Sequence, residues 1–123
     1  MKIIAISIFA LILLATNLLI GEADEVPLRY PSKYENMVLA NQISHKYEVP
    51  ARTVKRIIKL ESNWNEKARN LNEREDSRGL VQINRKAHPQ ISVTQTEDPS
   101  FAIDFLASNL SMGRGRMWST YGK

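Results

Sequence analysis

The chain has 123 residues, enough for one domain and no more. Its formal net charge of +4 suits an anionic partner such as a cell-wall polymer, a lipid headgroup or nucleic acid, and charge alone does not choose among these. The sequence has no cysteine, which excludes a disulfide scaffold and leaves the fold to depend on its apolar core. His45 and His88 stand alone, so we expect no metal site and no cofactor.

The N-terminal region has the pattern of an export signal. A basic start precedes an apolar run over residues 3–20, and the small residues Gly21 and Ala23 then lead into a polar region. This arrangement predicts a signal peptide over residues 1–23. The run is also long enough to span a bilayer, so a retained N-terminal anchor is the alternative. In both cases the rest of the chain lies outside the cytoplasm, because the basic charge precedes the run and acidic charges follow it.

A linker and a first helix are predicted next. Residues 24–34 contain two prolines and no hydrophobic periodicity, which indicates a linker. From Glu35 onward, small and apolar side chains recur every three or four residues, the spacing of one helix face. The members of this stripe are Met37, Ala40, Ile43, Ser44 and Tyr47. We therefore place the folded domain at residues 35–123.

The second predicted helix brings a carboxyl group onto its apolar face. It begins at Pro50, because proline suits a first helical turn, and runs to about Ser62. Its apolar stripe includes Ile57 and Ile58, and the next position of that stripe is Glu61. A carboxylate that faces a core is unfavourable unless it is paired or protonated. One explanation is a salt bridge to a nearby Arg or Lys, or fraying of the helix end that frees the side chain. The other is a carboxyl held in an apolar wall beside a cleft, where it can act as a general acid.

Beyond this helix the pattern becomes irregular and then helical again. Residues 63–78 are polar and have no stripe, which indicates a long loop. The short apolar segment 79–83 predicts a turn into a short helix, and residues 85–97 are irregular. Asp98 and Pro99 predict the N-cap and first turn of another helix. Its expected buried face consists of Ala102, Phe105, Leu106 and Leu110. No strand is apparent, so we predict a mainly α domain with little or no β-structure.

Two motifs, in this order, resemble those of the lytic transglycosylase (SLT) family. The first is Glu-Ser followed by an aromatic residue and an alanine, here Glu61, Ser62, Trp64 and Ala68. The second, Ser-x-Gly-Leu-x-Gln-Ile, resembles residues 77–84, which read Ser-Arg-Gly-Leu-Val-Gln-Ile-Asn. The resemblance covers roughly residues 36–112. It implies a lysozyme-like helical fold with a substrate cleft.

The resemblance also implies roles for single residues. Glu61 matches the family's catalytic glutamate, which protonates the oxygen between N-acetylmuramic acid (MurNAc) and N-acetylglucosamine (GlcNAc). The same carboxyl then takes the proton of the muramic 6-hydroxyl, which closes a 1,6-anhydro ring. Ser62 matches the serine that orients the glutamate, and Gln82 matches a glutamine that contacts substrate. Gly79 and Leu80 match the loop beside the cleft, where glycine lets the backbone approach a sugar closely.

One motif is missing, and this leaves a neighbouring reaction open. The family's third motif, Ala-Tyr-Asn, has no counterpart past the Asp-Pro helix, and Tyr121 is the candidate for its aromatic side chain. A goose-type-lysozyme-like hydrolase is the alternative, and inverting hydrolysis needs a second carboxylate to activate water. Glu73, Glu75 and Asp76 lie between the two motifs and could supply one. Solvated loop charges are the simpler interpretation of these three acids.

Two other classes of protein compete with an enzyme. A nucleic-acid-binding module would use the basic helical residues 51–59, but the export signal argues against it. A non-catalytic cell-wall-binding protein would keep the cleft without the chemistry, and the intact Glu61 argues against that. We therefore expect an exported monomer that cleaves peptidoglycan strands and binds no nucleic acid. It would be periplasmic, secreted, or anchored on the outer side of the inner membrane through residues 3–20.

Overall fold

The computed structural model describes residues 32–123. The signal peptide or anchor predicted over residues 1–23 lies outside the described residues, as does most of the linker predicted over 24–34. The first described helix, α2 (Ser32–Lys46), begins slightly before the predicted start at Glu35. Across the part of the chain that the structure describes, every helix is too short or too polar to cross a membrane.

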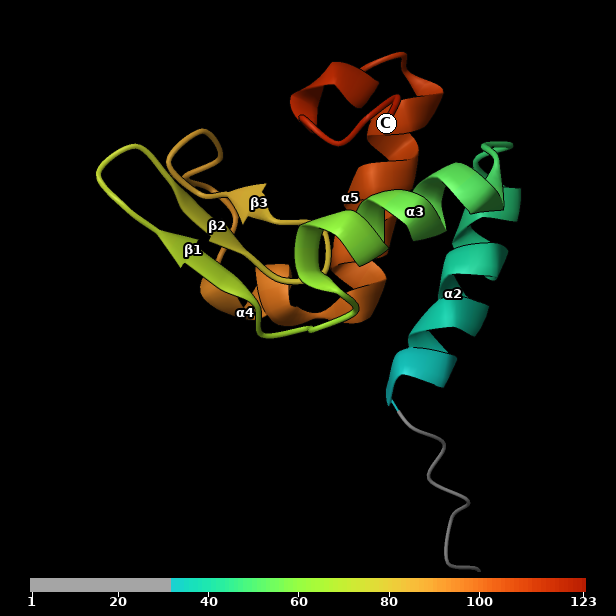
Figure 1. Ribbon diagram of the computed structural model, residues 1–123, viewed down its shortest axis with the longest axis horizontal. Coiled ribbons are helices and arrows are strands. Elements are labelled where there is room, and N and C mark those ends of the chain that lie inside the picture. The colour runs from blue at the N-terminus through green and yellow to red at the C-terminus, as the bar shows by residue number, and fades with distance from the viewer. Residues whose placement is uncertain (1–31) are drawn as a thin grey trace, which may run out of the picture.

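Three helices build the main layer of the domain. Helices α2, α3 (Ala51–Ser62) and α5 (Pro99–Ser111) all pack against one another (Figure 1). The predicted start of α5 is confirmed, since the Asp98 side chain accepts a hydrogen bond from the Ser100 backbone N–H and proline follows the cap. The buried apolar core contains Ala40, Ile43, Val54, Ile57, Ile58, Trp64, Leu80, Val81, Ile83, Ile91, Ala102, Ile103, Leu106, Ala107 and Trp118. The predicted mainly α fold is confirmed.

A small sheet stands beside these helices, where the sequence predicted a loop over residues 63–78 and a turn into a short helix over 79–83. The predicted short helix is wrong, since residues 79–82 form turns that lead into a strand. Strands β1 (Arg69–Leu71), β2 (Asp76–Arg78) and β3 (Ile83–Asn84) form one antiparallel sheet in that order (Figure 1). Their register pairs Ser77 with Asn70 on one side and with Asn84 on the other. The prediction of a structureless loop over residues 63–78 is therefore wrong. Strands this short and polar carry no alternation of apolar and polar residues that a sequence pattern could reveal.

The connection from β3 to α5 contains a further helix that the sequence analysis missed. Helix α4 (Val93–Glu97) begins with a capping box in which Ser92 and Gln95 satisfy each other's backbone N–H groups. Gly79 packs directly against this helix at a φ of +80°, and a Cβ placed on it would lie 1.8 Å from the Thr96 carbonyl oxygen. The packing of α4 against Gly79 thus requires glycine at this position, apart from the close approach of a sugar that the sequence predicts here.

The C-terminal segment folds back toward the sheet. After α5, the short 3₁₀ helix η1 (Gly115–Met117) turns the chain, and Trp118 enters the core. The indole Nε1 of Trp118 donates a buried hydrogen bond of 2.7 Å to the Val81 carbonyl, next to β3. This bond holds residues from the end of the chain above the end of α3 that carries Glu61 (Figure 1).

Candidate active site

Glu61 lies in the last turn of α3, at the end of the apolar stripe that the sequence indicated. Ile57 and Ile58 of this stripe are fully buried, whereas Glu61 is half-buried. Its Oε1 atom accepts a hydrogen bond of 2.7 Å from the Thr120 hydroxyl. Within residues 32–123, no Lys or Arg forms a salt bridge with Glu61, so ion pairing does not explain its position.

Glu61 opens into a polar cleft of about 320 Å³, which we call the Glu61 cleft. Helix α3, the three strands and the C-terminal segment each contribute to its wall. The lining residues are Glu61, Asn70, Glu75, Ser77, Gln82, Asn84, Met117, Trp118 and Ser119. Carboxyl, amide and hydroxyl groups thus converge on one hollow, as in sites that orient a ligand with many hydroxyl groups.

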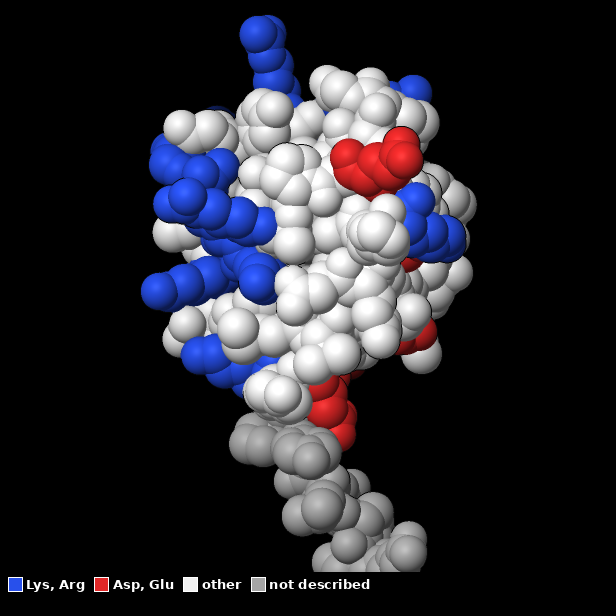
Figure 2. Space-filling view, turned by 90° about the vertical axis from the view of Figure 1, so that its right-hand side faces the viewer, with Lys and Arg blue, Asp and Glu red and all other residues white. Residues whose placement is uncertain are grey.

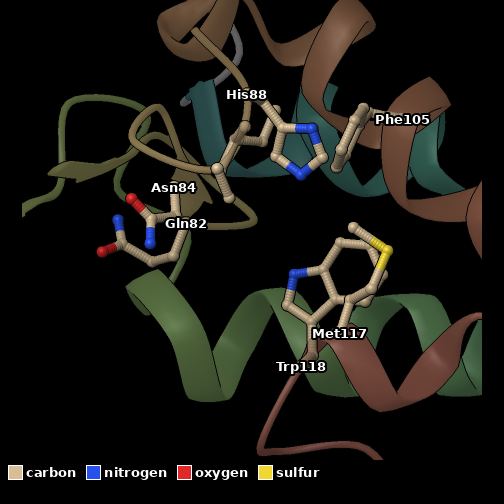
Figure 3. A pocket seen from close by; sticks show the side chains of 8 residues that line it. Gln82, Asn84, His88, Phe105, Met117 and Trp118 are labelled. Carbon is tan, nitrogen blue, oxygen red and sulfur yellow. The ribbon is translucent and has the colours of Figure 1, made fainter. Parts of the chain in front are cut away.

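Gln82 and Asn84 form the amide side of the Glu61 cleft, and Figure 3 shows them lying next to each other. The Gln82 Nε2 atom donates to the carbonyls of Ala68 (3.2 Å) and Gly79 (3.0 Å), which leaves its Oε1 as an acceptor. The Asn84 Oδ1 atom accepts the backbone N–H groups of Asp76 and Lys86, which leaves its Nδ2 as a donor. The pair can therefore offer a ligand one acceptor and one donor, both held in place by backbone contacts.

An apolar hollow of about 340 Å³ adjoins the Glu61 cleft. The two share Gln82, Asn84, Met117 and Trp118 in their linings. Figure 3 shows His88 facing Phe105, with Met117 and Trp118 on the opposite side from His88. Edge-to-face packing holds this wall, with ring centroids 5.3 Å apart for His88 and Phe105 and 6.1 Å apart for Phe105 and Trp118. A polar cleft beside an aromatic wall suits a ligand with both hydroxyl and methyl groups.

Glu75 is a second carboxylate of the Glu61 cleft. Its Oε1 accepts hydrogen bonds from the side-chain amides of Asn70 (2.6 Å) and Asn72 (3.0 Å). Its Oε2 accepts from the Ser77 hydroxyl at 2.7 Å. Glu75 is half-buried, so its interpretation as a solvated loop charge is wrong. The carboxylate fastens the β1–β2 hairpin through three donors.

The other two acids of this hairpin differ from Glu75. Asp76 pairs with Arg78 at 2.6 Å and with Arg85 at 2.8 Å, so it is not a solvated charge either. The hydrogen bond from Arg78, with a smaller contribution from Arg85, lowers the pKa of Asp76 against the opposing effect of desolvation. Glu73 is exposed, as the sequence analysis expected. Only Glu75 of these three acids therefore lines the cleft.

The remaining predicted site residues do not line the Glu61 cleft. Ser62 donates its hydroxyl to the Ile58 carbonyl at 3.1 Å and does not line the cleft. Gly79 and Leu80 are buried and support Gln82 from behind. Tyr121 is 48% exposed and lines a separate hollow, so it is not brought to Glu61.

Thr120, the neighbour of Tyr121, was missed by the sequence analysis although it contacts Glu61. Only the folding back of the C-terminal segment produces this contact, and no motif signals it. Ser77 and Asn84 lay inside the second motif but were not singled out. Within the described range, no group of three or more His, Asp or Glu side chains could hold a metal ion.

Comparison with known families agrees with this geometry. The family model described as the transglycosylase SLT domain matches residues 38–123, which include α3, the sheet, α5 and the C-terminal segment. No curated protein and no solved structure matches the chain. The matched region covers well over half of the chain and contains every residue of the Glu61 cleft. The chain therefore belongs to the transglycosylase SLT domain family.

Proposed function

We propose that this protein cleaves the β-1,4 bond between MurNAc and GlcNAc in peptidoglycan, with Glu61 as the only acid and base. Family membership supports the broader statement, an action of the lytic transglycosylase type on peptidoglycan. The observation that carries the finer proposal is the position of Glu61. Glu61 lies at the end of an apolar helix stripe, opens into a polar cleft, and forms no ion pair with the described residues.

In the first step the protonated carboxyl of Glu61 gives its proton to the glycosidic oxygen. The bond from that oxygen to C1 of the muramic residue breaks, and GlcNAc leaves with the new hydroxyl. In the second step the Glu61 carboxylate takes the proton of the muramic 6-hydroxyl, and O6 bonds to C1. The ring closes, Glu61 is protonated again, and no water is consumed.

Thr120 has a positioning role in this scheme. Its hydroxyl donates to Oε1 of Glu61, so one oxygen of the carboxyl is fixed while Oε2 has no partner among the described residues. A fixed carboxyl with one free oxygen can reach the glycosidic oxygen and then the 6-hydroxyl without losing its orientation. Gln82 and Asn84 would hold sugar hydroxyl or acetamido groups through their free amide atoms. Ser62, Gly79 and Leu80 support the cleft without contacting the sugar.

Hydrolysis is the second candidate, because Glu75 lines the same cleft as Glu61. A carboxylate that activates water needs an oxygen lone pair free to accept the water proton. Of the roughly four lone-pair directions of a carboxylate, three in Glu75 are taken by Asn70, Asn72 and Ser77. This occupancy favours the anhydro reaction over hydrolysis.

Mass spectrometry of the fragments released from purified peptidoglycan tests the proposal, because anhydro and reducing ends differ in mass by one water. We expect anhydro ends from the wild type and no fragments from Glu61→Gln. Reducing ends would show that the protein is a hydrolase. Fragments released by Glu61→Gln at the wild-type rate would exclude Glu61 as the catalyst.

A further inference from the structure

Helix α3 carries a row of cations on the side away from its core. Arg52, Lys55, Arg56 and Lys59 are spaced by three and four residues, so they lie on one face of the helix, which we call the basic face. The apolar stripe that leads to Glu61 lies on the opposite face. None of these four side chains forms a salt bridge or hydrogen bond with any of residues 32–123. The Nε atom of Arg56 is even buried without a hydrogen-bond partner.

The stability of the helix does not explain the basic face. Like charges three and four residues apart on a helix repel each other. Arg52 also lies in the first turn, where the positive end of the helix dipole disfavours a cation, and that turn contains no acid. Helix α3 forms in spite of these charges because its other face packs into the core. A ligand that supplies negative charge is the simplest reason for such a row.

We propose that the basic face is a docking surface for a membrane that contains anionic phospholipids. Figure 2 shows most of the Lys and Arg of this view along one side of the molecule, with others at its top and beside acidic residues on the opposite side, while no Asp or Glu interrupts the basic side. One-sided positive charge suits the flat, anionic surface of a bilayer. Because Glu61 lies on the opposite face of α3, a docked molecule would keep its cleft open to a glycan strand. The inference therefore does not depend on the reaction at Glu61.

The part of the chain that precedes the described residues favours a lipid surface over other polyanions. Residues 3–20 are an apolar run of the length that spans a bilayer, so the form that retains this run is tethered to a membrane. Residues 21–31 separate the run from α2 and can reach at most about 36–40 Å. Helix α2, which leads from this segment to α3, is only ~22 Å long. The tether is thus long enough for the basic face to meet the membrane, and two signals together anchor more firmly than one.

Vesicle binding by the full chain tests the proposal. The wild type is compared with the triple variant Arg52→Gln, Lys55→Gln, Lys59→Gln, which leaves the partly buried Arg56 in place. A matched control removes three exposed cations elsewhere, with Lys67→Gln, Arg74→Gln and Arg114→Gln. Each protein is titrated with vesicles of phosphatidylcholine alone and with vesicles that also contain phosphatidylglycerol. Binding to the first kind of vesicle measures the contribution of the apolar run. The difference in affinity between the two kinds measures the contribution of the charge.

We expect the wild type to prefer the anionic vesicles by at least about tenfold, since each cation near the surface contributes about fivefold. The α3 variant should lose most of this preference, the control should keep most of it, and salt should weaken it. An equal loss of this preference in the two variants would show that it depends on net charge alone, and would overturn the proposal. Tighter binding to double-stranded DNA or to a soluble phosphodiester polymer than to the anionic vesicles would also overturn it. Peptidoglycan cleavage should be unchanged in both variants.

Discussion

The replacement Thr120→Val tests whether the C-terminal segment holds the carboxyl of Glu61, the catalyst that we propose. Valine keeps the branched shape of threonine and removes only the hydroxyl that donates to Glu61 Oε1 at 2.7 Å. A hydrogen bond to a charged group contributes about 1.5–3 kcal/mol. Glu61 is half-buried, so water replaces part of this contribution and the lower end applies. A loss of about 1.4 kcal/mol in the transition state corresponds to a roughly tenfold lower kcat.

We expect KM to change little, because Thr120 contacts the carboxyl and does not line the Glu61 cleft. The assay is the rate of fragment release from purified peptidoglycan at several substrate concentrations. Thr120→Ser keeps the donor and should restore most of kcat, and Thr94→Val, on the exposed side of α4, should have no effect. An unchanged kcat for Thr120→Val, or a serine variant as slow as the valine variant, would refute a positioning role. A large fall in melting temperature would assign the residue to the fold.

Other residues give further expected outcomes. Glu61→Gln should lower the cleavage rate by at least about a thousandfold with little change in melting temperature, because the proposed mechanism uses this one carboxyl for both proton transfers; thermal unfolding provides the control. Glu75→Gln should lower the cleavage rate by less than about tenfold and still give anhydro ends, and Glu73→Gln should have no effect. Reducing ends, together with a near-complete loss of activity in Glu75→Gln alone, would favour hydrolysis. Gly79→Ala should lower the stability by at least about 2 kcal/mol in denaturant unfolding, since the added methyl meets a backbone carbonyl and φ is positive. The pKa of Asp76 lies below its ordinary value of 3.8, so its contribution to stability is complete above that value and is lost as the pH falls through the lowered pKa. Asp76→Asn should therefore be less stable than the wild type at neutral pH, and its stability should fall less on acidification. Acid unfolding that begins at a higher pH in this variant would show that other groups, and not this ion pair, determine acid stability.

The helices could be predicted from the sequence because their signals are local. The apolar stripe of α3 and the Asp98 cap of α5 each lie within a few neighbouring residues, and both are confirmed. The same locality revealed Glu61 as the residue that breaks a stripe. The sheet could not be predicted, because its strands have two or three residues each and β1 is fully exposed. Helix α4 is a single capped turn and carries too short a pattern to detect.

The cleft itself depends on contacts between segments far apart in the sequence. Asp76 and Ser77 are neighbours in β2, yet Ser77 lines the cleft and Asp76 pairs with arginines. Adjacent residues of a strand point to opposite sides of a sheet, so no local pattern could have assigned these roles without the register. Thr120 reaches Glu61 across 59 positions of sequence. Such a contact is a property of the whole fold.

The C-terminal segment also determines which of its side chains contacts Glu61. Tyr121 was the candidate for the aromatic side chain of the third motif, but its ring packs beside Gly115 and lines another hollow. The buried hydrogen bond of Trp118 to Val81 fixes the segment. Thr120, which precedes Tyr121 in the sequence, contacts the Glu61 carboxyl instead. The donor that contacts Glu61 is therefore the Thr120 hydroxyl, in a segment that the Trp118 hydrogen bond holds in place.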